Sequence, residues 1–110
     1  MSDNIEIGSL RERVTLQSPL RTPDGAGGAE VSWTAGATLW AKVETRGGGE
    51  AFASERLAAH ARFRVTIRHR AGVTAEMRLL WGGRALAISA LGDPDGRRRF
   101  LVLDCREERI

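Results

Sequence analysis

The side chains that most often act as nucleophiles, acid-base catalysts or metal ligands are scarce in this chain, and their spacing fits none of those chemistries. The single cysteine, Cys105, falls on the apolar side of an alternating segment, which favours an inert core thiol. His60 and His69 belong to neither a His-x-x-x-His nor a His-Glu-x-x-His pattern. Asp93 and Asp95 are explained by a turn and lack the spacing of a calcium loop. The sequence therefore predicts no catalytic residue, no cofactor-binding residue and no metal ligand, and we do not expect an enzyme.

Three consecutive glycines, Gly47, Gly48 and Gly49, have the composition of a phosphate-binding loop. Such loops precede a helix whose backbone N–H groups bind the anion, but neither a Gly-Lys-Ser/Thr ending nor a dinucleotide fingerprint is present here. A flexible hinge is the better interpretation. Residues 50–59 are rich in alanine and begin with Glu50, near the positive end of a helix dipole, so we expect a short α-helix there.

The densest basic run, Arg97-Arg98-Arg99, follows a turn and has two interpretations. It is either a solvated shoulder balanced by Asp93 and Asp95, or a contact to DNA phosphates or to an acidic patch on a partner. Tyrosine is absent and only three phenylalanines occur, so base stacking has little support. Sequence-specific or single-strand binding is therefore not expected.

The chain has 110 residues, which suits one domain, 1–110, with a thin core that other subunits would help to cover. It carries 17 basic and 14 acidic residues, and Lys42 is the only lysine. The excess of arginine fits a GC-rich coding bias, and it also fits a contact surface, because the planar guanidinium makes several hydrogen bonds at once. The sequence shows neither a signal peptide nor an apolar run long enough to cross a membrane. We therefore expect a soluble protein, made in the cytoplasm, with no membrane partner.

Alternation of apolar and polar residues with period two predicts a β-rich fold. After a polar lead-in over residues 1–10, the expected strands are 13–17, 30–33, 38–45, 61–69, 77–81, 84–91 and 99–107. Pro19 is expected to end the first strand, the glycine-rich segment 21–29 to form a mobile loop, and Gly82-Gly83 to join two strands tightly. The fold class is therefore mainly β, a small antiparallel β-barrel or sandwich of about six or seven strands with one short inserted α-helix.

Two of these strands indicate which side chains face outward. Their inward residues are Leu39, Ala41, Val43, Phe63, Val65 and Ile67. Their outward residues form the candidate interface with neighbouring subunits or partners: Trp40, Lys42, Glu44, Arg62, Arg64 and Arg68. A tryptophan that shares its face with a lysine and a glutamate is more typical of a subunit contact than of a core. A row of three arginines needs counter-charges, so acidic partners are expected across the sheet.

Several short motifs follow one another along nearly the whole chain: Gly8-x-Leu10-Arg11-x-Arg13-Val14, Asp24-x-x-Gly27-Gly28, Trp33, Leu39-Trp40-Ala41-x-Val43-Glu44, Gly49-Glu50, Phe63-Arg64-Val65-Thr66-Ile67-Arg68, Met77-Arg78, Ile88 and Asp93-Pro94. None is diagnostic alone. Their order and spacing together resemble the phage head-tail joining proteins, also called head-closure or stopper proteins, of tailed phages and gene transfer agents. The resemblance implies a small β-barrel with a helix and a structural role in the particle.

This resemblance also implies a homo-oligomeric ring of six or twelve copies in the neck of the virion or phage-like particle. The ring would lie between the portal or adaptor protein on the capsid side and the tail terminator or tail tube on the other. It would retain packaged double-stranded DNA without sequence specificity and dock the tail, after synthesis and assembly in the host cytoplasm. Two alternatives stay open: an OB-like nucleic-acid-binding module, and a neighbouring tail-completion protein of similar fold.

Two segments are candidates to project into the channel of such a ring, the loop 21–29 and a glycine-hinged helical insertion over 46–60. The insertion is preferred, because a hinge of three glycines before a short helix can move between closed and open states. Its candidate gate residues are Gly47, Gly48, Gly49, Glu50 and Phe52.

Overall fold

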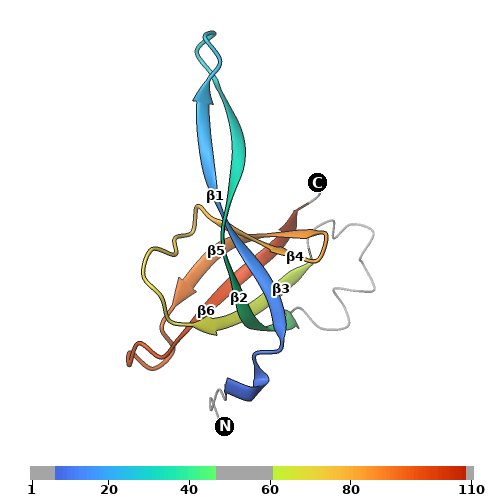
Figure 1. Cartoon of the computed structure of the whole chain (residues 1–110), viewed down its shortest axis with the longest axis vertical. Helices are drawn as coiled ribbons and strands as arrows, with labels where there is room; N and C mark the ends of the chain where they lie inside the picture. Colours follow the sequence, from blue (N-terminus) through green and yellow to red (C-terminus); the bar gives the residue numbers. More distant parts are fainter. Residues whose placement is uncertain (1–6, 47–60, 109–110) are drawn as a thin grey trace.

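In a computed structural model that describes residues 7–46 and 61–108, the chain forms a closed antiparallel β-barrel (Figure 1). A 3-10 turn, η1 (Ile7–Ser9), is followed by β1 (Glu12–Pro23), β2 (Ala29–Arg46), β3 (Arg62–Arg68), β4 (Arg78–Trp81), β5 (Arg84–Gly92) and β6 (Phe100–Glu108). The order around the barrel is β1-β2-β3-β6-β5-β4, and β4 pairs back with β1. The expected fold class, mainly β and barrel-like, is therefore confirmed.

Alternate residues of each strand point into the barrel and fill it. On β1, β3 and β6 the core contains Phe63, Val65, Ile67 and Cys105, which the sequence predicted to face inward, together with Val14, Leu16, Leu101 and Leu103. On β2, Ala41 is buried, whereas Leu39 and Val43 pack against the core from partly buried positions. Leu79, Leu86 and Ile88 close the core from β4 and β5. Period-two alternation thus assigns these inward residues correctly, although Thr66 and Phe100, which alternate with them on β3 and β6, are buried as well.

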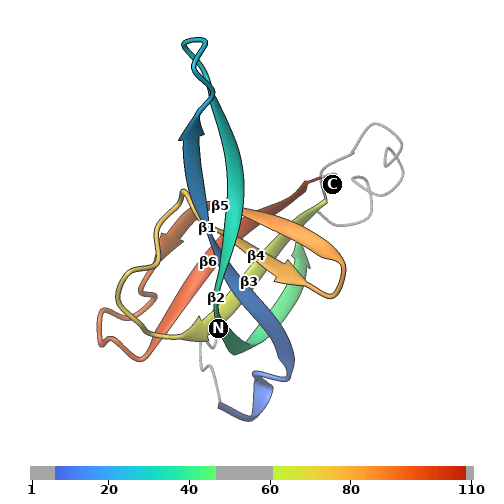
Figure 2. The same cartoon turned by 45° about the horizontal axis from the view of Figure 1, so that its top comes forward.

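The β1–β2 hairpin extends beyond the barrel as a two-stranded arm (Figures 1 and 2). Within the barrel, β1 pairs with β4 only over 15–17, and β2 pairs with β3 only over 41–46. Farther out, 18–23 and 29–34 pair with each other alone. We call residues 18–34 the arm. An isolated two-stranded hairpin is only marginally stable in water.

The arm contradicts the expectation that Pro19 ends the first strand. Pro19 lies opposite Trp33 within the β1–β2 pairing, and the strand continues to Pro23. Because the arm has only two strands, each has an outer edge, where proline's missing N–H costs no ladder hydrogen bond. The segments 30–33 and 38–45, expected as separate strands, are likewise parts of the single strand β2.

The tip of the arm is a turn at 24–28, shorter than the loop expected over 21–29, because the outer residues of that segment belong to the strands. Asp24 Oδ1 accepts hydrogen bonds from the backbone N–H groups of Ala26 at 2.8 Å and Gly28 at 3.1 Å. These two bonds, the first above all, lower the pKa of Asp24. Gly25 and Gly27 take φ values of +81° and +86°, a conformation that side chains disfavour.

The glycine hinge and the expected α-helix over 50–59 lie outside the described residues, and so does most of the lead-in 1–10. Within residues 7–46 and 61–108, no helix is long and apolar enough to span a membrane.

Candidate interfaces on the barrel

Register across the outer face of β2, β3 and β6 arranges charged residues in rows. In one row, Arg64 lies directly between Glu44 and Asp104. Arg64 Nε lies 3.7 Å from Asp104 Oδ1, and Lys42 Nζ lies 3.6 Å from Glu44 Oε2. Both contacts are longer than hydrogen bonds, so each contributes little, about 0–1 kcal/mol. The acidic partners expected for the arginine strand are nevertheless present opposite Arg64.

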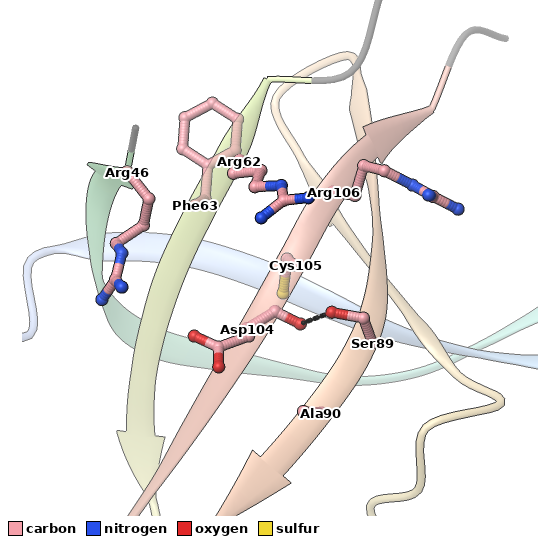
Figure 3. Close-up of a pocket in the computed structure, with 8 residues that line it drawn as sticks. All are labelled: Arg46, Arg62, Phe63, Ser89, Ala90, Asp104, Cys105 and Arg106. Carbon is pink, nitrogen blue, oxygen red and sulfur yellow. Dashed lines mark hydrogen bonds between the residues drawn. The ribbon is translucent and has the colours of Figure 1, made fainter. Parts of the chain in front are cut away.

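The neighbouring row consists of three arginines. Arg46, Arg62 and Arg106 lie directly opposite one another on β2, β3 and β6. They line a surface hollow of about 430 Å³ together with Phe63, Ser89, Ala90, Asp104 and Cys105 (Figure 3). Sequence reasoning singled out only Arg62. Arg46 and Arg106 each stand near the end of a strand, and only the register brings the three together.

Cys105 lies beneath this hollow as a free thiol with an exposed fraction of 3%. Burial, followed by the nearby charge of Asp104, raises the pKa of the Cys105 thiol to about 12. Because the thiolate is the reactive form, the thiol is inert at neutral pH. The expectation of a structural core cysteine agrees with this environment.

The three tryptophans have different environments, and each has an arginine over its ring. Trp40 has an exposed fraction of 54%, and the Arg13 guanidinium lies 4.7 Å from the centre of its ring. Trp33 lies on the arm, and the Arg78 guanidinium lies 4.2 Å from the centre of its ring. Trp81 packs edge-on against Phe63, with ring centres 5.5 Å apart, and donates a hydrogen bond to Glu12 at 3.2 Å. The Arg84 guanidinium also lies over the Trp81 ring, 4.8 Å from its centre. Trp40 is thus the tryptophan most available for contact with another molecule.

The six candidate interface residues do not form one patch. Arg62 begins β3 and Arg68 ends it, so their Cα atoms are about 20 Å apart along the strand. Arg68 lies opposite Phe100 at the other end of the barrel, and Trp40 lies opposite Arg13 on β1. Of the six, Lys42, Glu44 and Arg64 lie close together as a charged cluster on β2 and β3.

The basic run at 97–99 lies in the β5–β6 loop, which the two preceding aspartates organise. Asp93 accepts hydrogen bonds from the backbone N–H groups of Gly96 and Arg98, and Asp95 accepts one from that of Arg97. Arg98 takes a φ of +59°, which this bonding helps to hold.

Arg99 is bound within the same loop. Its guanidinium forms an ion pair with Asp95, whose pKa it lowers. It also lies 6.0 Å from the centre of the Phe100 ring. Arg99 thus fits the solvated-shoulder interpretation, while Arg97 and Arg98 remain exposed.

Arg84 and Glu107 form a two-pronged ion pair between β5 and β6. Arg84 Nε donates to Glu107 Oε2 at 3.0 Å, and Nη2 donates to Oε1 at 2.7 Å. The hydrogen bonds from Arg84 lower the pKa of Glu107, despite partial burial. Arg84 also lies over the rings of Phe63 and Trp81, at 5.0 Å and 4.8 Å. The pair therefore links β5 to β6 and contributes to their pairing at the edge of the core.

We expect Glu107→Gln to destabilise the protein by about 0.5 kcal/mol at pH 7, because both partners are partly exposed to solvent. A lowered pKa in the folded state means that the stabilisation is present above about pH 4.3, the usual glutamate value, and is lost as pH falls through the folded value. The difference in free energy of unfolding between the variant and wild type, measured by urea unfolding, should therefore become smaller toward pH 3. Glu76→Gln, an exposed site in no ion pair with the described residues, should show no such trend, and an equal trend would contradict this role for the pair.

The candidate gate residues Gly47, Gly48, Gly49, Glu50 and Phe52 lie outside the described residues. Within the described part of the chain, no group of three or more His, Cys, Asp or Glu side chains is placed to hold a metal ion.

Comparison with known proteins identifies relatives of the whole chain. The family of phage head completion proteins matches residues 5–108. A chain from the virion of a native gene transfer agent particle is 26% identical, with a TM-score of 0.71, and the match covers 92% of this chain and 96% of that one. The solution structure of protein SF1141 from Shigella flexneri 2a is 35% identical, with a TM-score of 0.67 and coverage of 94% and 96%. No curated protein matches.

The family match covers nearly all of the barrel-forming sequence, including every described strand. It confirms the resemblance to head-tail joining proteins that the order of motifs indicated. One of the structural neighbours is itself a virion component. The chain therefore belongs to the phage head completion protein family.

Proposed function

We propose that this protein is a structural subunit that joins head and tail in a tailed phage or a gene transfer agent. The observation that carries the proposal is the family match over residues 5–108, supported by the barrel shared with a chain of a gene transfer agent virion. The exposed surface is rich in arginine contacts of the kind that orient protein partners. The role is assembly, and no catalytic step is part of it.

We further propose that copies form a ring in the particle neck, between portal or adaptor and tail. The arm supports this proposal, because its outer half is paired with nothing in its own barrel. Leu20 and Val31 on the arm have exposed fractions of 54% and 49%. Large exposed apolar side chains on a marginal hairpin are typical of a surface that a partner covers.

The two apolar residues face opposite ways. Leu20 is paired with Ser32, and Val31 with the adjacent Arg21, so successive pairs place Leu20 and Val31 on opposite faces of the hairpin. A subunit in a ring touches one neighbour on each side through two different surfaces. An arm with one apolar side chain on each face suits that arrangement better than a single isologous contact.

Retention of packaged DNA within this ring is part of the proposal, as is docking of the tail. Trp40 and the cluster of Lys42, Glu44 and Arg64 remain the proposed contacts with partners, because they are outward-facing on β2 and β3. Arg97 and Arg98 remain proposed contacts to DNA or to an acidic partner.

Disruption of the gene in a particle-producing strain tests the proposal. We expect filled or emptied heads and separate tails by electron microscopy, with complete particles restored when the gene is supplied again. Normal numbers of complete tailed particles would refute a head-tail joining role. A map of the neck into which the barrel fits on the tail side alone would instead favour a tail-completion protein.

A further inference from the structure

We propose that Arg46, Arg62 and Arg106 form a binding site for the phosphate groups of double-stranded DNA. We call these three residues the arginine row. The inference deepens the proposed function and rests on it for the presence of DNA near the protein. It names a site other than the basic run at 97–99.

The row is a product of strand register. Arg62 on β3 lies opposite Arg46 on β2 and opposite Arg106 on β6. Figure 3 shows the three guanidinium groups spread across the hollow, with Arg62 between the other two. With strands about 4.8 Å apart, the three Cα atoms span about 10 Å. Like charges directly opposite one another across a sheet are destabilising, so an anionic ligand bound there would relieve the repulsion.

The nearby carboxylates on β6 form their ion pairs with arginines outside the row. Asp104 lines the hollow but pairs with Arg64. Glu107 pairs with Arg84 at 2.7 Å, and Glu108 pairs with Arg78 at 3.8 Å. Among the described residues, none forms an ion pair with a member of the arginine row. All three side chains are exposed, and within the described part of the chain their positive charges are left without an ion-pair partner.

Charge density favours duplex DNA over an acidic peptide as the ligand. Duplex DNA carries one negative charge per about 1.7 Å of its axis with both strands counted, so about three phosphates of each strand lie along a span of 10 Å. An extended peptide offers one side chain to a given face about every 6.6 Å, so at most about two carboxylates over the same span. Three guanidinium groups, each able to bind phosphate through two hydrogen bonds, match the duplex better.

The site is suited to the DNA backbone and not to the bases. Phe63 is the aromatic residue that lines the hollow, and its exposed fraction is 2%, so its ring is unavailable for stacking. Contacts to phosphate carry no sequence information by themselves. Binding at the arginine row should therefore be independent of sequence and strongly dependent on salt.

The test compares two triple variants of the full chain that lose the same charge. Arg46→Gln, Arg62→Gln and Arg106→Gln remove the arginine row. Arg21→Gln, Arg68→Gln and Arg70→Gln form the matched control, because all three are exposed, none lines the hollow and none is a proposed DNA contact. Each triple change lowers the net charge from +3 to 0.

Affinity for a short labelled duplex of mixed sequence is measured by fluorescence anisotropy over a range of salt concentrations. Loss of the arginine row should reduce the slope of log affinity against log salt by about 2.7, since each phosphate contact contributes about 0.9. Affinity at low salt should fall by more than about tenfold. The control should retain most of the wild-type slope.

Three outcomes would overturn the inference. The first is an unchanged salt slope in the arginine-row variant, and the second is an equal loss of slope in the control. The third is displacement of the duplex by polyglutamate at equal charge concentration, which would indicate a site for carboxylates. Urea unfolding of both variants verifies that each is folded. Gene disruption that leaves complete particles would refute the proposed function while leaving the measured DNA site intact, so the two failures are distinguishable.

Discussion

Replacing Leu103 with alanine is expected to lower the free energy of unfolding by about 3 kcal/mol. Leu103 is fully buried on β6, opposite Val65 on β3 and Leu91 on β5. Truncation removes apolar burial and leaves a cavity that neighbouring strands of a closed barrel cannot easily fill. A domain of this size has about 5–15 kcal/mol of stability in total, so the loss is a large share. Urea unfolding followed by tryptophan fluorescence measures it.

The matched control is Leu20→Ala, the same chemical change on the exposed arm. Leu20 has an exposed fraction of 54% and lies outside the barrel, so its truncation should change the free energy of unfolding by less than about 0.5 kcal/mol. If the two variants were equally destabilised, the placement of Leu103 at the centre of the core would be wrong. A large difference isolates burial as the cause, because the atoms removed are identical.

The parts of the fold that depend on local pattern could be predicted from the sequence. Alternation alone assigned Phe63, Val65 and Ile67 to the core. The Gly82-Gly83 turn is also confirmed, since Trp81 pairs directly with Arg84 and Gly82 takes a φ of +62°. Both features depend on residues close in sequence, for which side-chain direction and turn geometry follow from the residue types.

The parts that depend on pairing between distant segments could not be predicted in this way. Taken alone, Pro19 predicts the end of a strand. The strand continues past it because the arm has only two strands, each with a free outer edge. The arginine row is a second case, because Arg46, Arg62 and Arg106 come from three strands and meet only through register. Alternation marks Arg62 as outward-facing, but it does not say what lies opposite.

In the loop at 93–99, hydrogen bonds and an ion pair within the loop bear on whether the basic run is a solvated turn or a contact to a polyanion. A run of three arginines looks like one basic patch in the sequence. In the structure, Asp95 pairs with Arg99, and Asp93 holds the backbone that carries Arg98. The positive charge of the run is thus partly compensated within its own loop, whereas the arginine row is left without an ion-pair partner among the described residues. Charge left without an ion-pair partner, more than the density of arginine in the sequence, is therefore the basis of the proposed DNA site.

Replacing both Leu20 and Val31 with aspartate is expected to prevent assembly of complete particles while the barrel stays folded. If the arm packs between neighbouring copies, each change places a charge in an apolar contact, and losses of about 2 kcal/mol or more per site are typical of central interface residues. Every 1.4 kcal/mol weakens association about tenfold, so the double variant should lose most complete tailed particles. Electron microscopy of particles made with the variant gene counts them.

The control is Thr34→Asp, which adds a charge to the arm at an exposed polar position opposite Ser18. It should leave particle numbers near wild type, because no apolar contact is lost there. Urea unfolding of the isolated Leu20→Asp, Val31→Asp protein should match wild type within about 1 kcal/mol, since both residues are exposed and lie beyond the barrel pairing. Wild-type numbers of complete particles from the double variant would show that the arm is not a subunit contact. A folded variant that fails to assemble, beside a control that succeeds, would instead place the contact between copies on the two apolar faces of the arm.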